Sequence, residues 1–534
     1  MRPGVYVQEA PLPRIIEPPA IGITAGAFIG TSLKGPSEPV LVTSWSQFVG
    51  LFGTITSDDQ RASLAPAVYQ SFGNGGGQCY VCRVLPSDAT KASVTLGDAD
   101  GDPILVVGAA SAGYWGNGIA VDIVHPLDLA QIVQDPGNRS GPFSMQFAPA
   151  FDRPMDTRPP LVRPDGVRVN VFDIVVRNTV RGVSVVVERF SNLTLDATSP
   201  RYAERVINSS TVGSQYIEVR DLLHGTAMDQ VPAVIEREFL SGGSDGSANP
   251  SAGDYTEVAR LFELIPGNLI FNVPGIADVS GVEDVVQARA DSFLVVDAPN
   301  ITDLTRLLDT AFTTSSYSAV YYPWVAIPDP DPAAQRGSIR WVPPGGSVAG
   351  MIMRMDSSRG SFKAPAGVGA SLTGVVATSR KLTNVELDLL NNYQINAIRP
   401  IRGSGITVMG ARTRDFQTTA RYISVRRTLN WIKEQAKNAS QFALFEPNTP
   451  VLWEQLRVAN GAFLSELWQV GGLAGRTFAE GFYVKVDSDN NPPSAIANGE
   501  VHIEIGVAPV FPAEFVIIRL GQFEADASFV VSEE

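Results

Sequence analysis

Cysteine and histidine are scarce in this chain of 534 residues, which contains two cysteines and three histidines. Cys79 and Cys82 form a lone CxxC within QCYVCRV, which we predict to be a β-strand whose positions i and i+3 point to opposite faces. A thioredoxin-type CxxC opens a helix, and zinc would need two more ligands, whereas His125, His224 and His502 lie far apart in the sequence. We therefore predict two buried thiols, no metal site and no cofactor.

Long apolar runs and excess positive charge are also missing. No stretch approaches the roughly 20 apolar residues that cross a bilayer, and the first 19 residues contain five prolines in place of a signal peptide's apolar region. We expect neither secretion nor membrane insertion. Lys and Arg number 41 and Asp and Glu number 55, so the net charge is 41 − 55 = −14. Because phosphate binding depends on basic side chains, the composition also argues against nucleic acid as a partner.

The sequence lacks the motifs of common enzymes, including HExxH, the P-loop and the EF-hand. The stretch 242–246 matches GxSxG with Ser244 as the nucleophile, but a polar, proline-broken segment follows where a nucleophile elbow needs a helix. Asp297 ends a predicted strand, where a catalytic or ribose-binding acid can lie, but no glycine fingerprint accompanies it. We interpret Ser244 as a loop residue and Asp297 as a loop-capping residue, and we predict that the protein is not an enzyme.

The chain length predicts three to four domains, and 44% apolar residues supply material for packed cores. Residues 248–330 alternate helices with strands at 268–273, 292–297 and 318–327, a βαβαβ pattern that predicts a parallel sheet. Ser280 with Glu283, and Thr383 with Glu386, have the spacing of capping boxes at helix starts. The fold class is therefore α/β and multidomain. We divide the chain into segments 1–20, 21–86, 87–240, 241–344, 345–506 and 507–534, of which 1–20 is an extended arm and 87–240 is β-rich.

Both ends of the chain combine prolines with a short β-prone run, VYV at 5–7 and EFVIIRL at 514–520. A strand without a partner exposes unpaired backbone groups, and adding it to a neighbouring molecule's sheet would satisfy them. The alternative is that both strands pair within their own chain, as in most globular proteins.

The segment 396–437 inverts the charge of the chain. It holds nine basic and two acidic residues, so its net charge is 9 − 2 = +7. A solvated helix face is one interpretation, and a surface complementary to an acidic partner is the other. Nucleic acid is a weaker third, because Phe416, Tyr422 and Trp431 between the basic residues are better explained by core packing.

Several segments resemble the tail sheath proteins of contractile injection systems, a family that includes phage tail sheaths, R-type bacteriocin sheaths and the sheaths of extracellular injection particles. The order of these segments along the chain matches the family. The segments are 3–9, 27–53, 340–367, 405–414, 422–432, 444–448 (LFEPN) and 506–522.

The resemblance implies a structural subunit that polymerises as stacked hexameric rings around an inner tube and contracts to drive the tube through a target envelope. It implies a discontinuous α+β core from 21–86 and 345–506, an α/β middle domain at 241–344 and a protruding insertion at 87–240. The implied partners are further copies of the chain, an inner tube protein, and baseplate and tail-terminator proteins. Assembly in the bacterial cytoplasm as part of a phage tail or tail-like particle is expected.

The resemblance also implies that both arms add strands to neighbouring subunits. The receiving sheet would use the chain's own strands at 481–487 and 500–506. The implied strand-exchange residues are Val5, Tyr6, Val7, Phe515, Val516, Ile517, Ile518, Tyr483, Val484, Ile503 and Ile505. The candidate contacts to the inner tube are Arg421, Arg426, Arg427, Lys433 and Lys437. The alternatives are a tube-forming or capsid-like assembly protein that does not contract and, more remotely, an α/β enzyme built on 248–330.

Overall fold

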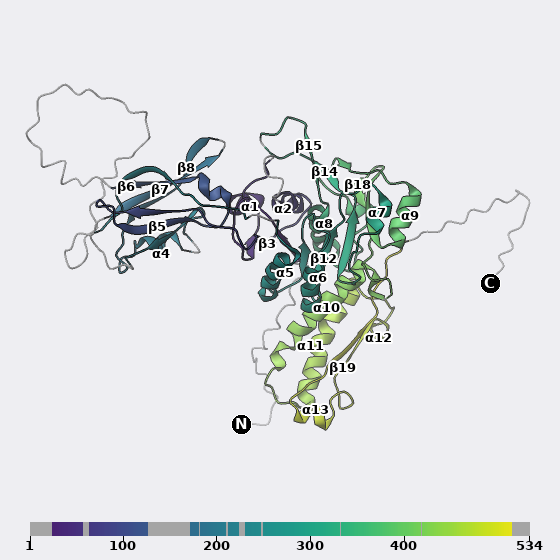
Figure 1. Ribbon diagram of the computed structural model, residues 1–534. Coiled ribbons are helices and arrows are strands. Elements are labelled where there is room, and N and C mark those ends of the chain that lie inside the picture. The colour runs from purple at the N-terminus through teal and green to yellow at the C-terminus, as the bar shows by residue number, and fades with distance from the viewer. Residues whose placement is uncertain are drawn as a thin grey trace, which may run out of the picture.

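A computed structural model describes residues 24–56, 63–125, 171–180, 182–209, 212–223, 230–246, 249–331, 333–417 and 419–514. The predictions for the arm 1–20 and for residues 515–534 lie outside these residues. The described chain has three parts: a central α/β body, a β-rich domain on one side and a lobe of two long helices below (Figure 1). Among the described residues, no helix is both long and apolar enough to cross a membrane.

The body is built around an eight-stranded sheet. Its six central strands are parallel and one antiparallel strand lies at each edge. The strand order is β18 (Gly405–Val408), β17 (Ile395–Ile401), β13 (Ser318–Tyr322), β12 (Phe293–Asp297), β11 (Leu269–Asn272), β1 (Ala25–Gly30), β3 (Cys79–Arg83) and β2 (Val40–Val42). Such a sheet requires cover on both faces, because apolar side chains leave each strand in both directions.

Helices cover both faces of this sheet. One face carries α1 (Trp45–Phe52), α2 (Leu64–Gly73) and α8 (Gly345–Arg359). The other carries α5 (Ala252–Arg260), the 3-10 turn η2 (Leu261–Leu264), α6 (Ser280–Arg289), α7 (Leu304–Leu308) and α9 (Asn384–Asn392). Cys79 packs with the first set and Cys82 with the second, so the prediction that they face opposite sides and are buried is confirmed.

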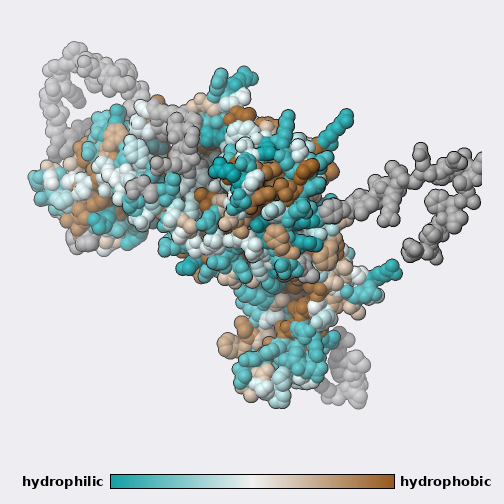
Figure 2. Space-filling view, turned by 45° about the vertical axis from the view of Figure 1, so that its right-hand side comes forward, coloured by the Kyte–Doolittle hydropathy of each residue, from teal (hydrophilic) through white to brown (hydrophobic). Residues whose placement is uncertain are grey.

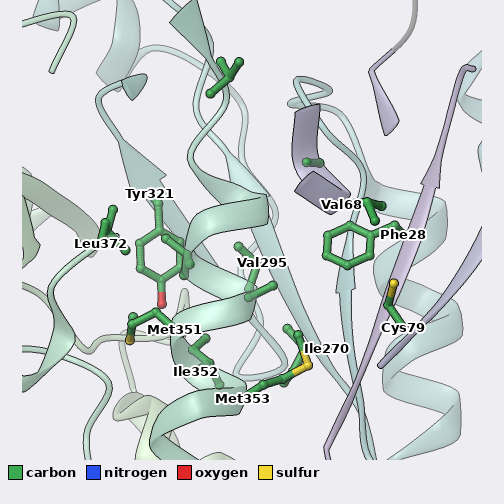
Figure 3. Packing of buried hydrophobic residues seen from close by; sticks show 14 of the residues in the cluster. Phe28, Val68, Cys79, Ile270, Val295, Tyr321, Met351, Ile352, Met353 and Leu372 are labelled. Carbon is green, nitrogen blue, oxygen red and sulfur yellow. The ribbon is translucent and has the colours of Figure 1, made fainter. Parts of the chain in front are cut away.

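Helix α8 packs closely on the sheet and on α2. Met351, Ile352 and Met353 point from α8 toward Tyr321, Val295 and Ile270 of the strands (Figure 3). A Cβ on Gly346 would lie 2.3 Å from the Ala67 carbonyl oxygen, and one on Gly350 would lie 2.3 Å from that of Ser71. Only glycine permits this approach, so these two positions of the run RWVPPGGSVAGM set the distance between α2 and α8.

The eight-stranded sheet draws on three of the predicted segments. Strands β1 and β3 come from segment 21–86, β11, β12 and β13 from segment 241–344, and β17 and β18 from segment 345–506. Helix α8 of the last segment packs on α2 of the first, and Ala25 of β1 lies opposite Leu269 of β11. The predicted division into domains stays a prediction. The predicted strand 318–327 is also two strands, because β13 ends before Pro323 and β14 (Val325–Pro328) pairs with β15 (Ile339–Val342) and β16 (Ala377–Thr378).

The segment expected to be β-rich folds as two antiparallel sheets around one apolar cluster. The first contains β4 (Ser93–Gly97), β5 (Pro103–Ala109) and β9 (Ile217–Asp221). The second contains β10 (Ile235–Phe239), β6 (Ile119–Val124), β7 (Phe172–Val180) and β8 (Val183–Leu193). A 3-10 turn (η1, Tyr114–Gly118) and the short helix α4 (Ala203–Ile207) are the helical elements of this domain in the described residues.

The two predicted capping boxes had different outcomes. Thr383 caps α9, accepting from the Glu386 amide while Glu386 accepts from the Thr383 amide, as predicted. The prediction for Ser280 is wrong, because Ser280 is the first residue inside α6 and donates to Asp278. Burial raises the pKa of Glu283, which lies inside the body.

Candidate functional site: the C-terminal lobe

The lobe consists of two antiparallel helices and a small sheet. It contains α10 (Ile423–Ser440), a 3-10 turn η5 (Gln441–Ala443), α11 (Pro450–Gln469), α12 (Phe478–Gly481), β19 (Phe482–Lys485), α13 (Pro493–Ala497) and β20 (Glu504–Val507). Thr449 is the N-cap of α11 with proline at N1, and its side chain makes no capping hydrogen bond. Figure 2 shows the lobe projecting below the body, with polar residues over most of the visible face at its tip.

The predicted strands of the receiving sheet pair with each other. β19 and β20 are antiparallel, with Tyr483 opposite Gly506 and Val484 opposite Ile505. Val484 and Ile505 pack on the helices, while Tyr483 is 52% exposed. Ile503 lies just before β20 and packs with Ile496 against the helix end near Leu452. The sheet is therefore apolar on the helix side and polar on the other, which is the alternation of a half-buried antiparallel sheet.

This sheet has two strands among the described residues. Just beyond β20, Pro509 forms an isolated bridge with Leu473, and no third described strand pairs with the sheet. Isolated two-stranded sheets are marginal in water and gain stability from packing or from added strands. A close contact fixes the register: a Cβ on Gly506 would lie 2.0 Å from the Tyr483 ring, so the ring covers the glycine across the strand pair. The Tyr483 hydroxyl donates to Glu504 at 2.6 Å.

Arg427 is not at the surface. Its guanidinium donates to both carboxylate oxygens of Asp356 in α8, and the two side chains are 5% and 2% exposed. The prediction that Arg427 faces an inner tube is corrected by this placement, because a buried charge with a bidentate partner joins α10 to the body. The sequence around Arg427 and Asp356 does not predict that these two residues form an ion pair.

Arg426 and Lys433 converge on one tyrosine. Tyr317, just before β13, lies 4.5 Å from the Arg426 guanidinium by ring centroid, and its hydroxyl oxygen accepts from Lys433 Nζ at 2.9 Å. Arg426 is half-buried, and burial lowers its pKa, with Tyr317 and Asp415 acting in the opposite direction. Sequence reasoning missed Tyr317, since its partners on α10 are 109 and 116 residues away.

Two of the predicted basic residues are exposed without a buried ion pair. Arg421 lies before α10 with its guanidinium 5.4 Å from the Tyr422 ring centroid, and Lys437 lies in the last turns of the helix. Arg426, Lys433 and Lys437 are spaced by seven and four residues, which places them on one face of α10. The exposed basic face of α10 therefore consists of Lys433 and Lys437, with Arg426 at its edge, and Arg421 is exposed just before the helix.

The candidate enzymatic residues have structural partners. Ser244 lies in a loop, where its hydroxyl accepts from the Gly246 amide, and the next described helix begins at Ala252. Asp297 is fully buried at the end of β12 and accepts from the Gly275 and Gly345 amides at 3.1 and 2.6 Å. Burial raises its pKa to about 6 against the opposing effect of these hydrogen bonds and that from Asn272. These placements support the loop and loop-capping interpretations.

The cysteines offer no reactive centre. Burial raises the thiol pKa of Cys82 to about 12 and raises that of Cys79 further. In the part of the chain that the structure covers, no group of three or more His, Cys, Asp or Glu side chains could hold a metal ion.

The fold is thus a mixed α/β multidomain fold whose C-terminal lobe presents an open sheet and a basic helix face. A family model described as the phage tail sheath C-terminal domain matches residues 417–522, which contain this lobe. The chain is 29% identical over 192 residues, 36% of its length, to the tail sheath protein of Vibrio phage KVP40. The matched part spans 28% of that phage protein.

A second relative is the putative prophage major tail sheath protein of Pseudomonas aeruginosa, 24% identical over 309 residues that cover 57% of this chain and 74% of the relative. Among solved structures, the sheath complex of the extracellular contractile injection system PVC in its contracted state has the same fold, with a TM-score of 0.54, 21% identity and 98% of both chains covered. These matches confirm the resemblance to the tail sheath proteins of contractile injection systems.

Proposed function

We propose that the protein is the structural subunit of a contractile tail sheath, polymerising as stacked six-membered rings around an inner tube and contracting to drive that tube through a target envelope. Its tail sheath relatives and its C-terminal sheath domain support this role. The observation that carries the proposal is the two-stranded β19–β20 sheet, which no described strand completes on either side.

In this proposal the sheet accepts strands from two neighbouring subunits, one from residues Val5–Val7 and one from Phe515–Ile518. Both segments lie outside the described residues. An added strand with four or five backbone hydrogen bonds gains roughly 1 kcal/mol for each bond, and two or three buried apolar side chains add roughly 2 kcal/mol each. Each subunit gives two arms and receives two, so the links reinforce one another through effective concentration.

The exposed basic face of α10 is the proposed contact to the inner tube protein. Arg421, Lys433 and Lys437 are available for an acidic surface, and Arg426 lies beside them. Baseplate and tail-terminator proteins are the remaining proposed partners, at the two ends of the sheath. The extended sheath is held in a metastable state, and contraction releases that stored free energy as subunits rotate while strand pairing persists.

Electron microscopy of the purified protein tests the proposal. We expect two helical tube states that differ in pitch and diameter. A single tube state that no treatment converts would support a non-contractile assembly protein instead, and protein that never forms tubes would contradict both.

Deleting residues 1–20 tests strand exchange separately. We expect a folded, monodisperse subunit that no longer builds long extended sheaths, because one of the two incoming strands is lost. Replacing the same residues with a Gly/Ser segment of equal length is the matched control for chain length, and it should fail to assemble as the deletion does. Normal sheaths from either variant would refute exchange through the N-terminal arm.

A further inference from the structure

The described segments that lead to the two arms both end on ion-paired side chains near the start of α10. At the C-terminal end the segment 508–514 leaves β20 and runs to the edge of the body. At the N-terminal end the described chain begins at Thr24, next to α8. The C-terminal segment reaches the ion pair of Arg412 with Glu514, which contacts Tyr422, the N-cap of α10. The N-terminal end reaches the ion pair of Asp356 with Arg427, a residue of α10.

The C-terminal segment is held at three successive points. The Ala508 carbonyl accepts from the Ala474 amide at 2.8 Å, and the Phe511 ring meets the Tyr422 ring edge-on with centroids 6.1 Å apart. Glu514 accepts from Arg412 Nε and Nη2 at 3.2 and 2.8 Å and from the Tyr422 hydroxyl at 3.3 Å. Tyr422 is the N-cap of α10, so this segment is fastened to the beginning of that helix.

Arg412 is itself held rigidly. Its amide donates to Asn396 Oδ1, its carbonyl accepts from the same side chain, and its Nη1 donates to the Asn391 carbonyl at 3.0 Å. The Arg412 and Glu514 side chains are 14% and 21% exposed, so water screens the pair only partly. The guanidinium is therefore oriented by the body before it meets Glu514, which lowers the entropy lost on forming the pair.

The N-terminal root uses the buried pair described above. The Thr24 hydroxyl donates to Asp356 Oδ2 at 2.7 Å, and the same carboxylate pairs with Arg427 in the second turn of α10. One carboxylate thus joins three elements: the residue before β1, helix α8 and helix α10.

We propose that Arg412, Tyr422, Asp356 and Arg427 form an arm anchor, which fixes the roots of both arms to the first turns of α10. This inference rests on the proposed sheath function, in which the arms bind two further copies of this chain. Tension in either arm then reaches the helix that carries the exposed basic face, rather than the loops that join the lobe to the body. Arg412 and Glu514 act as positioning residues, which hold the C-terminal arm where it can add its strand to a neighbouring subunit's sheet.

Loss of the C-terminal part of the anchor would change the reach of the arm. With Glu514 and Phe511 released, the next fixed point is Pro509, which bridges to Leu473, so five more residues become free and add roughly 17 Å of slack at about 3.3–3.6 Å per residue. Slack lowers the effective concentration of a tethered strand and lets a neighbouring subunit shift without pulling on α10.

The test compares the full-length protein with Glu514→Ala, the charge-swapped pair Arg412→Glu with Glu514→Arg, and Glu466→Ala as a matched loss of an exposed carboxylate on α11. Hydrogen exchange at the amides of Val510, Phe511, Ala513 and Glu514 is measured on subunits, and tube length is measured by electron microscopy. We expect Glu514→Ala to speed exchange at these amides at least tenfold and to shorten tubes at least twofold. The charge-swapped pair should partly restore slow exchange and tube length, and Glu466→Ala should change neither the exchange rates nor the tube length.

Unchanged exchange in Glu514→Ala would show that the segment is held without this pair and would overturn the anchor. Faster exchange with tubes of normal length would overturn its role in strand delivery. Unmutated protein that forms no tubes would refute the proposed function itself, whereas normal unmutated tubes with unaffected variants refute the anchor alone.

Discussion

The molecule contains two sheets of opposite character. In the body, every residue of β1 and β12 is buried, and helices cover both faces of an eight-stranded sheet. In the lobe, no residue of β19 or β20 is fully buried, and helices cover one face of a two-stranded sheet. The first sheet is covered by helices on both faces, whereas the second is narrow and covered on one face among the described residues.

The two sheets therefore differ in what they can do: the body sheet is rigid, and the lobe sheet can bind further strands. A doubly covered sheet resists deformation because its side chains are close-packed and its central strands have partners on both sides. A sheet with open edges can accept strands from other molecules through backbone hydrogen bonds. In the proposed sheath, the body would move as a unit while the lobe and the arms keep neighbours joined.

The largest difference in stability between the two sheets should come from removing one phenylalanine ring from each. Phe28 in β1 is fully buried, and Phe482 in β19 is only partly buried. We expect Phe28→Ala to lower the free energy of unfolding by roughly 3–5 kcal/mol through lost burial and a cavity. Phe482→Ala should lower it by roughly half as much, because its ring already contacts solvent. Urea unfolding of subunits measures both, and equal losses would remove the distinction between the sheets.

Much of the local structure could be predicted from the sequence. Apolar runs predicted β11 and β12 within one or two residues. Both lobe strands were predicted longer than they are, since the polar ends of 481–487 and 500–506 pack or turn rather than pair.

Long-range pairing could not be predicted. Nothing in ITAGAFIG specifies that β1 lies beside β11, because a fully buried parallel strand has no alternation to mark its partner. The same limit applies to charge: Arg426 and Arg427 are adjacent in a basic run, yet one stacks on Tyr317 and the other pairs with buried Asp356. Local charge density predicted a basic face but not which residues belong to it.

Arg427→Ala tests the joint between body and lobe. Asp356 would be left as a buried, unpaired carboxylate, a situation that typically costs about 3–5 kcal/mol, so we expect a loss of at least roughly 3 kcal/mol in unfolding free energy. Lys437→Ala, on the exposed face of the same helix, is the matched control and should stay within about 0.5 kcal/mol of the unmutated protein. A small effect of Arg427→Ala would mean that the pair does not join the two parts.

Asp297 gives the body a pH dependence. Its pKa of about 6 in the folded protein exceeds the usual value near 3.9, so the folded state binds this proton more tightly than the unfolded state. Unfolding free energy should therefore fall as pH rises from 4 to 6 and then level off. Because each pKa unit corresponds to about 1.4 kcal/mol, the unmutated protein should lose roughly 2–3 kcal/mol relative to Asp297→Asn over this range. If the unfolding free energies of the unmutated protein and Asp297→Asn changed in parallel with pH, the raised pKa of Asp297 would be contradicted.

The smallest effect on stability, and the most selective effect on assembly, should come from the exposed basic face. Lys433 and Lys437 are both exposed, so the double change Lys433→Glu and Lys437→Glu should leave unfolding free energy within about 1 kcal/mol. If these side chains bind an acidic tube, the double variant should fail to co-assemble with the tube protein in a pull-down, and high salt should weaken the unmutated contact too. Arg457→Glu, on the exposed face of α11, is the control for charge reversal elsewhere in the lobe. Co-assembly that survives both the double reversal and high salt would remove α10 from the tube interface and leave strand addition as the lobe's only role in assembly.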